Sequence, residues 1–371
     1  MAGVYISYPF CAQKCTYCNF ASGVFPRELE PRYLEALSGE LAAAEWPWMP
    51  ETVYLGGGTP SRLTPGALAA LLDLVPGKPW AEATIEAAPG GITADLSRAW
   101  RDAGIDRVSL GVQSFDVREL ARTGRKHTAQ IVAAEIAILR AEGLENFNVD
   151  LIAGLPGQTR ESWTASLDWI ERLNAPHVSI YMLEVDEDSR LGAEILRWSR
   201  LQPATGTSVP VPRYSAAEIP TDDAIADFYE LAVERLAVIG IHRYEISNFA
   251  RPGFESRHNL KYWRREPYLG FGADAHSFDG ASRWQNAETA SEYVERLTAG
   301  LSPVVARAPA DSSEDFFLGL RLDEGIDADW SPYRESVEKL AEEGLLEARG
   351  RRLRLTPRGV LLSNEVFAEF I

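Results

Sequence analysis

Residues 5–20 read Tyr5-Ile-Ser-Tyr-Pro-Phe-Cys11-Ala-Gln-Lys-Cys15-Thr-Tyr-Cys18-Asn-Phe20. This stretch holds every cysteine of the chain, in the spacing Cys-x3-Cys-x2-Cys. An odd number of thiols this close together argues against a disulfide framework and for a metal site. Three thiolates suit a cubane iron–sulfur cluster, which keeps one iron open for a non-protein ligand. The alternatives are a zinc site completed by a distant residue such as His127, or inert buried thiols.

The size and charge of the chain exclude several classes of protein. Its 371 residues exceed one typical compact core and predict two domains, or one barrel with an appendage. No apolar run approaches the ~20 residues of a membrane span, and we recognise no signal peptide. With reactive thiols and no export signal, we expect a cytoplasmic location. The net charge of −17 disfavours non-specific binding of nucleic acid.

Short apolar strands alternate with amphipathic helices from the N-terminus to about residue 185. The expected strands lie at 4–7, 52–55, 83–87, 107–112, 147–152 and 177–183. Between them, helical patterns place apolar residues at i, i+4 and i+7, as in Leu96, Trp100 and Ala103. Six βα units in series predict an α/β fold with a parallel sheet, here a partial six-unit (β/α) barrel. Functional groups are then expected at the carboxyl ends of the strands.

The remainder of the chain has a different character. Residues 200–220 are rich in proline, glycine, serine and threonine, and they read as a loop or a poorly ordered insertion. Residues 242–284 are dense in aromatic residues and glycine. From about residue 288 the pattern is helical, and 324–356 predicts helices followed by a two-stranded wing. We therefore expect a C-terminal winged-helix-like helical domain. Its arginines suit DNA, but the acidic chain favours an interaction or lid role.

Polar residues follow the predicted strands one after another. Gly56-Gly57-Gly58-Thr59-Pro60 comes directly after the second strand, and glycines permit close approach of a ligand to the backbone. Glu86, Gln113 and Asp150 lie in or at the end of the third, fourth and fifth strands. A polar group buried there costs free energy unless it has a partner. The series is best explained by one ligand that carries hydroxyls, an amine and a carboxylate.

The cysteine motif, placed just after a short apolar strand, resembles that of the radical S-adenosylmethionine (SAM) superfamily. The resemblance implies a [4Fe-4S] cluster whose open iron takes the amino and carboxylate groups of SAM. It also implies that the reduced cluster gives the sulfonium one electron, which produces a 5′-deoxyadenosyl radical. An electron donor for the cluster is then an expected partner.

Further motifs narrow the resemblance. Tyr-Ile-x-x-Pro-Phe-Cys, Gly-Gly-Gly-Thr-Pro, Glu-Ala-x-Pro-Gly, Arg-Val-Ser-Leu-Gly-Val-Gln-Ser-Phe and Asp-Leu-Ile-x-Gly-Leu-Pro-Gly-Gln-Thr occur in this order. Together they resemble the oxygen-independent coproporphyrinogen III oxidase family and its heme chaperone branch, HemW. The resemblance implies the cluster ligands Cys11, Cys15 and Cys18. It implies the following SAM contacts: Tyr5 near the sulfonium, Gly57, Gly58 and Thr59 at the methionine moiety, Glu86, Gln113 and Asp150 around ribose and methionine, and Arg125 on a carboxylate.

Two features separate the branches of this family. The pattern that resembles the oxidases is Cys-x3-Cys-x2-Cys-x-Cys. This chain has Phe20 where that pattern has its last cysteine. The segment His258-Asn259-Leu-Lys-Tyr262-Trp263 resembles the His-Asn-x-x-Tyr-Trp motif of the heme chaperones. The resemblance thus implies heme binding by these four residues and delivery of heme to apo-hemoproteins. An imidazole is a suitable axial ligand for heme iron, and aromatic side chains cover a porphyrin face.

Two other readings remain open. One is an oxidase that decarboxylates coproporphyrinogen III by hydrogen abstraction, and the other is a winged-helix binding module. The expected domains are a radical SAM barrel at 1–200, a barrel extension with the heme-binding segment at 201–287, and the winged-helix-like domain at 288–371. Two features depart from the family pattern: Ser7-Tyr8 replaces His-Ile before Pro-Phe-Cys, and the insertion near residue 210 is long.

Overall fold

The structure, a computed structural model, describes residues 2–185, 189–199 and 218–371. Within this part of the chain, six parallel strands lie side by side in sequential order. They are β1 (Ala2–Tyr8), β2 (Pro50–Gly57), β3 (Glu82–Ala87), β4 (Arg107–Gln113), β5 (Asn146–Ala153) and β6 (His177–Met182). Each of the first five contains one of the predicted strands, and β6 ends one residue before the end of the sixth. The order confirms the α/β fold and the partial six-unit barrel.

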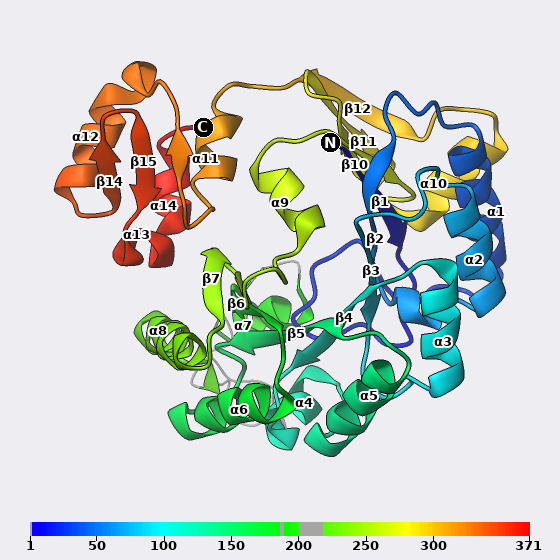
Figure 1. Ribbon diagram of the computed structural model, residues 1–371, viewed down its shortest axis with the longest axis horizontal. Helices are drawn as coiled ribbons and strands as arrows, with labels where there is room; N and C mark the ends of the chain where they lie inside the picture. The colour runs from blue at the N-terminus through cyan, green and yellow to red at the C-terminus, as the bar shows by residue number, and fades with distance from the viewer. Residues whose placement is uncertain (1, 186–188, 200–217) are drawn as a thin grey trace, which may run out of the picture.

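Helices connect the strands and cover the outer face of the sheet (Figure 1). They are α1 (Leu29–Ala42), α2 (Pro65–Asp73), α3 (Ala94–Ala103), α4 (Val117–Thr123), α5 (Ala129–Ala141) and α6 (Arg160–Leu173). The predicted cap of α2 is present, because the Thr64 hydroxyl accepts a hydrogen bond from the Ala67 N–H at 3.2 Å. The apolar stripes face the sheet, and Trp100 and Trp163 are fully buried. This packing fixes the carboxyl ends of the strands.

The region rich in aromatic residues and glycine extends the sheet on both sides. β9 (Tyr268–Phe271) pairs parallel with β1, and β10 (His276–Phe278), β11 (Ser282–Asn286) and β12 (Val304–Pro309) continue it antiparallel. On the far side of β6 lie β8 (Asn248–Ala250) and β7 (His242–Glu245). Four more helices lie between β6 and β12 in the chain: α7 (Arg190–Ser199), α8 (Asp222–Val238), α9 (Arg257–Trp263) and α10 (Ala290–Thr298). The predicted insertion lies outside the described residues, except at its C-terminal end.

A small domain follows the last strand of the large sheet. It contains α11 (Glu314–Gly319), β13 (Ile326–Asp327), α12 (Arg334–Glu342), β14 (Leu346–Arg349), β15 (Arg352–Leu355), α13 (Pro357–Leu361) and α14 (Ser363–Ala368). Its three strands form a separate sheet, with β15 between β13 and β14, and this confirms the winged-helix-like domain. The structural boundary falls after β12 and not at residue 288. The reason is that α10 packs on α1 and β12 pairs with β11.

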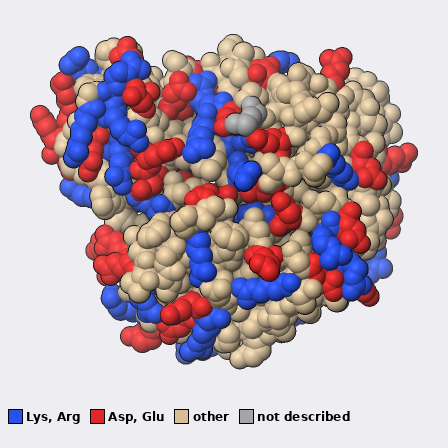
Figure 2. Space-filling view, in the orientation of Figure 1, with Lys and Arg blue, Asp and Glu red and all other residues tan. Residues whose placement is uncertain are grey.

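Several arginines of the small domain pair with acidic neighbours. Arg351 pairs with Asp327 at 2.8 Å and Arg354 with Asp323 at 3.3 Å. Figure 2 shows basic and acidic side chains interspersed over this domain. Such exposed pairs contribute little to stability. They leave a mixed surface here instead of a continuous basic one.

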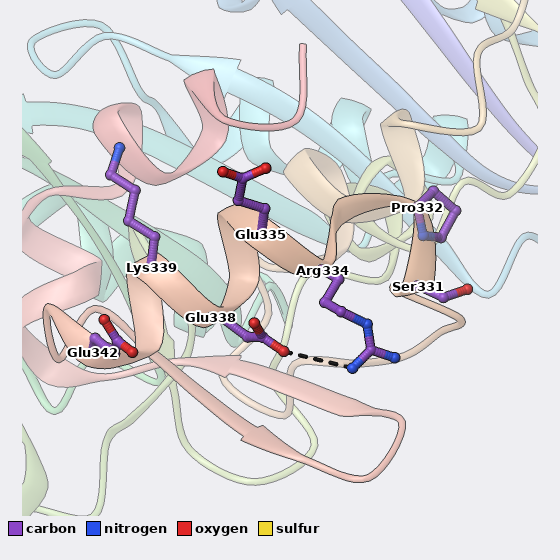
Figure 3. A pocket seen from close by; sticks show the side chains of 7 residues that line it. All are labelled: Ser331, Pro332, Arg334, Glu335, Glu338, Lys339 and Glu342. Carbon is purple, nitrogen blue, oxygen red and sulfur yellow. Dashed lines mark ion pairs between the residues drawn. The ribbon is translucent and has the colours of Figure 1, made fainter.

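A shallow hollow of about 520 Å³ runs along α12 (Figure 3). Its side chains come from one helix and the turn before it, and they carry both signs of charge. Arg334 pairs with Glu338, four residues further along the same helix, at 3.5 Å. The groups therefore do not converge on a ligand. Among the described residues, none of the helices has the length and apolar character needed to cross a membrane.

Candidate functional site

The cysteine loop starts where β1 ends and leads into α1. Two backbone hydrogen bonds fold it back on itself, from the Cys11 N–H to the Gly23 carbonyl at 2.8 Å and from the Gly23 N–H to the Pro9 carbonyl at 2.9 Å. The thiols of Cys11, Cys15 and Cys18 are free and partly buried. All three predicted ligands therefore lie at the carboxyl end of the barrel.

The glycine-rich turn after β2 fixes the start of this loop. The Gly58 N–H donates to the Tyr8 carbonyl at 2.8 Å, and the Thr59 N–H donates to the Phe10 carbonyl at 3.0 Å. A Cβ atom at Gly58 would lie 2.7 Å from the backbone carbon of Pro9, so only glycine fits. The turn thus has a structural role beside any ligand. Its N–H groups at 58 and 59 already have backbone partners.

One cavity of about 210 Å³ opens beside the cysteine loop. It is lined by Tyr5, Ser7, Pro9, Phe20, Ala21, Ser22, Gly57, Glu86, Ala273 and Asp274. Three residues predicted for the SAM site, on three different strands, thus come together in one place. The lining also includes Ser7, the position that departs from the family pattern.

Glu86 is the best-held polar group of this cavity. The Tyr54 hydroxyl donates to its Oε1 at 3.0 Å, and the Gly57 N–H donates to its Oε2 at 3.1 Å. Burial, with a further contribution from the charge of Asp150, raises the pKa of Glu86 to about 7. The carboxyl group is therefore fixed in position and changes charge near neutral pH.

Gln113 and Arg125 lie together next to the end of β4. Gln113 has a φ of 71°, in the left-handed region, and the pairing of β4 with β5 shifts register just before it. Arg125 donates to the Gly111 carbonyl at 2.6 Å and to the Tyr17 hydroxyl of the cysteine loop at 3.4 Å. Its Nε is buried and has no hydrogen-bond partner among the residues that the structure describes. A buried donor left open in this way favours a ligand nearby.

Asp150 belongs to a polar network inside the barrel. The Asn148 amide donates to its Oδ1 at 2.6 Å, and the Ser109 hydroxyl donates to its Oδ2 at 3.4 Å. Burial raises the pKa of Asp150 above its usual range. Asp150, Gln113 and Arg125 do not line the 210 Å³ cavity. They form a second group on β4, β5 and the turn after α4.

The structure places His258 at the opposite end of the barrel. It lies on α9 (Arg257–Trp263), and a Cβ on Gly3, near the start of β1, would come within 3.1 Å of its ring. Glu82, the first residue of β3, accepts hydrogen bonds from the N–H groups of Arg257 and His258 at 2.9 and 3.0 Å. Gly3 and Tyr8 are separated by roughly 16 Å along β1. The predicted heme segment and the cysteine loop are therefore at different ends.

Both ring nitrogens of His258 are engaged. Nδ1 lies 2.8 Å from the Thr52 hydroxyl, and Nε2 lies 2.8 Å from the Tyr262 hydroxyl. The side chain is 1 % exposed, and its ring stacks on Tyr54 with centroids 5.2 Å apart. Burial, followed by the charges of Lys261 and Arg107, lowers the pKa of His258 to about 3. The imidazole is therefore neutral at pH 7.

The other residues of this segment are partly buried. Asn259 N–H donates to the Ser256 hydroxyl at 3.3 Å, so it forms part of the helix cap. The Trp263 ring lies under the Arg321 guanidinium of the small domain at 4.3 Å, and its buried indole N–H has no partner in the described part of the chain. Arg264 pairs with Glu324 of the small domain at 3.2 Å. Helix α9 is thus held between the barrel and the small domain (Figure 1).

The donor set at the cysteine loop fits an iron–sulfur cluster. Among the described residues, no three His, Cys, Asp or Glu side chains gather around one point as a single metal ion requires. A cubane binds each thiolate to a different iron, so the three sulfurs stay apart. The free thiols and the open Nε of Arg125 beside this loop suit a cluster with a further ligand.

Among the lining residues that sequence analysis missed, Ala273 and Asp274 lie far from the cysteine loop in sequence. They belong to Gly-Phe-Gly-Ala-Asp-Ala, residues 270–275, which begins in the last two residues of β9 and continues into the turn after it. A glycine-rich stretch after a strand was the available signal, and it is the same signal that identified residues 56–60. This signal alone does not place the stretch at the site, because β9 reaches the barrel only by pairing with β1, 265 residues away in sequence (Gly3 with Tyr268).

Comparisons with known proteins agree with this geometry. Residues 5–170 match the Radical SAM superfamily, and residues 311–362 match the HemN C-terminal domain. The chain is 37% identical to a Mycobacterium tuberculosis H37Rv protein named heme chaperone HemW, over 98% of this chain and 93% of that one. It is 32% identical to the Bacillus subtilis protein of the same name, over 100% and 99%.

A solved structure shows the same fold. It is that of the Escherichia coli coproporphyrinogen III oxidase HemN, described as a radical SAM enzyme, with a TM-score of 0.83 and 21% identity over 100% of this chain and 89% of that one. Membership of the radical SAM superfamily implies a [4Fe-4S] cluster and SAM. With full-length identities above 30% to two of its members, the chain belongs to the HemW family of the radical SAM superfamily.

Proposed function

We propose that this protein carries a [4Fe-4S] cluster and SAM, and that it binds heme and delivers it to apo-hemoproteins. Its end-to-end similarity to proteins named heme chaperone carries this proposal. Cys11, Cys15 and Cys18 are the proposed cluster ligands, and they would hold a cluster that, once reduced, would supply one electron to SAM. A cytoplasmic location and a partner that reduces the cluster remain predictions.

The proposed SAM site is the cavity beside the cysteine loop and the polar groups behind it. Tyr5, Gly57 and Glu86 line the cavity. The proposed role of Gly58 and Thr59 is indirect, since their N–H groups hold the cysteine loop in place. Gln113, Arg125 and Asp150 would bind parts of SAM that extend toward β4 and β5. The proposed heme-binding residues are His258, Asn259, Tyr262 and Trp263.

The relatives favour a chaperone over an oxidase. Phe20 stands at the position where the oxidase pattern has a cysteine. Its side chain is 67% exposed and lines the cavity. A chaperone should hand over bound heme once, and an oxidase should turn over coproporphyrinogen III many times. These outcomes differ in stoichiometry, so one pair of assays separates them.

The test uses anaerobically reconstituted protein. Loaded with heme, it is mixed with apomyoglobin, and transfer is followed by the absorbance of the acceptor, with heme-loaded serum albumin as the control for passive release. We expect transfer of about one heme per chain, faster than from albumin. In parallel, the protein is incubated with coproporphyrinogen III, SAM and reductant. Repeated formation of protoporphyrinogen IX would contradict the proposal and favour the oxidase.

Asp150→Asn tests the proposed SAM contacts. The substitution keeps the shape and the acceptor for Asn148 but removes the charge. Loss of a charge-assisted hydrogen bond costs about 1.5–3 kcal/mol, so SAM affinity should fall roughly 10- to 100-fold while iron content stays at the parent level. Calorimetric titration with SAM measures the change. The control is Asp168→Asn on α6, whose carboxylate pairs with Arg235 outside the barrel. Equal affinities for parent and Asp150→Asn would remove Asp150 from the site.

A further inference from the structure

The residue Asp274 has an unusual backbone on the wall of the cavity. Its φ is 57°, in the left-handed region that residues other than glycine rarely adopt. Aspartate tolerates this conformation better than most residues, but a glycine would adopt it without strain. Strained residues of this kind persist where the surrounding structure holds them and are concentrated at ligand sites. The backbone conformation of Asp274 therefore points to a ligand-binding role for its carboxylate.

The backbone around Asp274 is fixed by buried groups. The N–H of Gly272 donates to Glu40 at 2.8 Å, that of Ala273 to the Tyr33 hydroxyl at 2.9 Å, and that of Asp274 to the Ala287 carbonyl at 2.8 Å. Glu40 is held in turn by hydrogen bonds from Asn286 and Tyr293. The turn after β9 is thus anchored to α1, α10 and the end of β11. Asp274 is presented to the cavity by a rigid support.

The Asp274 carboxylate has one oxygen to spare. The Gln285 amide donates to Oδ1 at 3.0 Å. Among the described residues, no hydrogen bond reaches Oδ2. Both oxygens of Glu86, the other carboxylate of this cavity, already accept hydrogen bonds from Tyr54 and Gly57. Asp274 is therefore the carboxylate better able to take a new partner.

The lining of the cavity has an unbalanced charge. It contains the Asp274 carboxylate and the Glu86 carboxyl group, which changes charge near neutral pH, and, among the described residues that form it, no lysine, arginine or histidine. The two carboxylates lie close enough to Tyr5 that, after burial itself, both add to the rise in the pKa of its hydroxyl. Such a cavity favours a positively charged ligand and disfavours a neutral one of the same shape.

We propose that Asp274 is a specificity residue that recognises the positive charge of the SAM sulfonium and selects SAM over S-adenosylhomocysteine. This inference rests on the proposed SAM site. The two molecules differ by one methyl group and by the charge on sulfur, so a fixed carboxylate discriminates between them chiefly by charge. Asp274 binds and selects, and no chemical step is assigned to it.

The experiment compares both ligands on anaerobically reconstituted protein by calorimetric titration. The variant Asp274→Asn keeps the side-chain shape and tolerates a positive φ. We expect its SAM affinity to fall roughly tenfold, and its S-adenosylhomocysteine affinity to stay within about twofold of the parent value. Asp274→Gly, which suits the backbone, should give the same loss of selectivity. The control Asp279→Asn removes a carboxylate that pairs with Arg307 outside the cavity, and it should change neither affinity.

Three outcomes are informative. Weakening of SAM alone in both Asp274 variants supports the inference. Equal weakening of both ligands, or no change in either, overturns it and leaves the proposed SAM site intact. If the reconstituted parent protein binds neither ligand, the proposed function fails and the inference fails with it. Iron content and circular dichroism of each variant show whether the cluster and the fold are retained.

Discussion

Replacing Cys15 with alanine is expected to remove the iron–sulfur cluster completely. The chain has three cysteines, all in the loop after β1, so no other thiol is available to replace the missing ligand. A cubane held by two thiolates has two unprotected irons and is readily lost. Iron content and the visible absorbance after anaerobic reconstitution should fall to the background of unreconstituted protein. Cys11→Ala and Cys18→Ala should behave in the same way.

The fold should survive this change, which makes the prediction specific. The cysteine side chains are only partly buried, and the loop is held by backbone hydrogen bonds from Cys11, Gly58 and Thr59. Circular dichroism should therefore match the parent protein. Lys14→Ala, in the same loop, removes an exposed amine that donates to the Phe20 carbonyl at 3.0 Å and should keep the cluster. Metal analysis that finds one zinc per chain in the parent would refute the cluster.

The sequence was sufficient for the barrel because its signals are local. Each parallel strand is a short apolar run, and each helix carries its own stripe and often its own cap, as Thr64 does for α2. The extension of the sheet could not be predicted in the same way. β8, β9 and β10 have three or four residues each, too few for a periodic pattern, and β9 depends on pairing with β1 far away in sequence. β8 and β9 form because they pair with segments far away in the sequence, which a local pattern does not record.

The candidate site, too, has features that could be predicted from the sequence and features that could not. Motifs that follow strands could be placed from sequence, because parallel strands end at one edge of the sheet. Two features depended on contacts that no local pattern records. Gly58 is glycine because the backbone of Pro9 passes close to it, and Asp274 reaches the cavity through β9. The burial of His258 also depends on Thr52, 206 positions earlier in the chain.

His258→Ala is expected to abolish the heme spectrum of this protein. The imidazole is neutral at pH 7, since the pKa of His258 is lowered to about 3, and neutral imidazole is the form that binds iron. In the structure both of its nitrogens are engaged and the ring is buried under α9. Heme ligation through Nε2 therefore requires this nitrogen to leave the Tyr262 hydroxyl and α9 to move away from the barrel. Loss of the imidazole should remove the Soret band while iron–sulfur content stays unchanged.

Tyr262→Phe should strengthen heme binding. This variant distinguishes an effect on iron ligation by His258 from an effect on folding. The substitution keeps the aromatic surface but removes the hydroxyl that occupies Nε2. Breaking that hydrogen bond costs about 0.5–1.5 kcal/mol, so heme affinity should rise roughly 2- to 10-fold.

The matched control is Tyr268→Phe, whose ring contacts Tyr262 but whose hydroxyl accepts a hydrogen bond from Arg283 and has no bond to His258. His258→Gln, which can still donate to Thr52, guards against loss of heme through misfolding. Heme titrations of the four variants decide the matter. If His258→Ala and His258→Gln bind heme with the affinity and spectrum of the parent, the iron is held by another residue, and α9 serves as the closed end of the barrel.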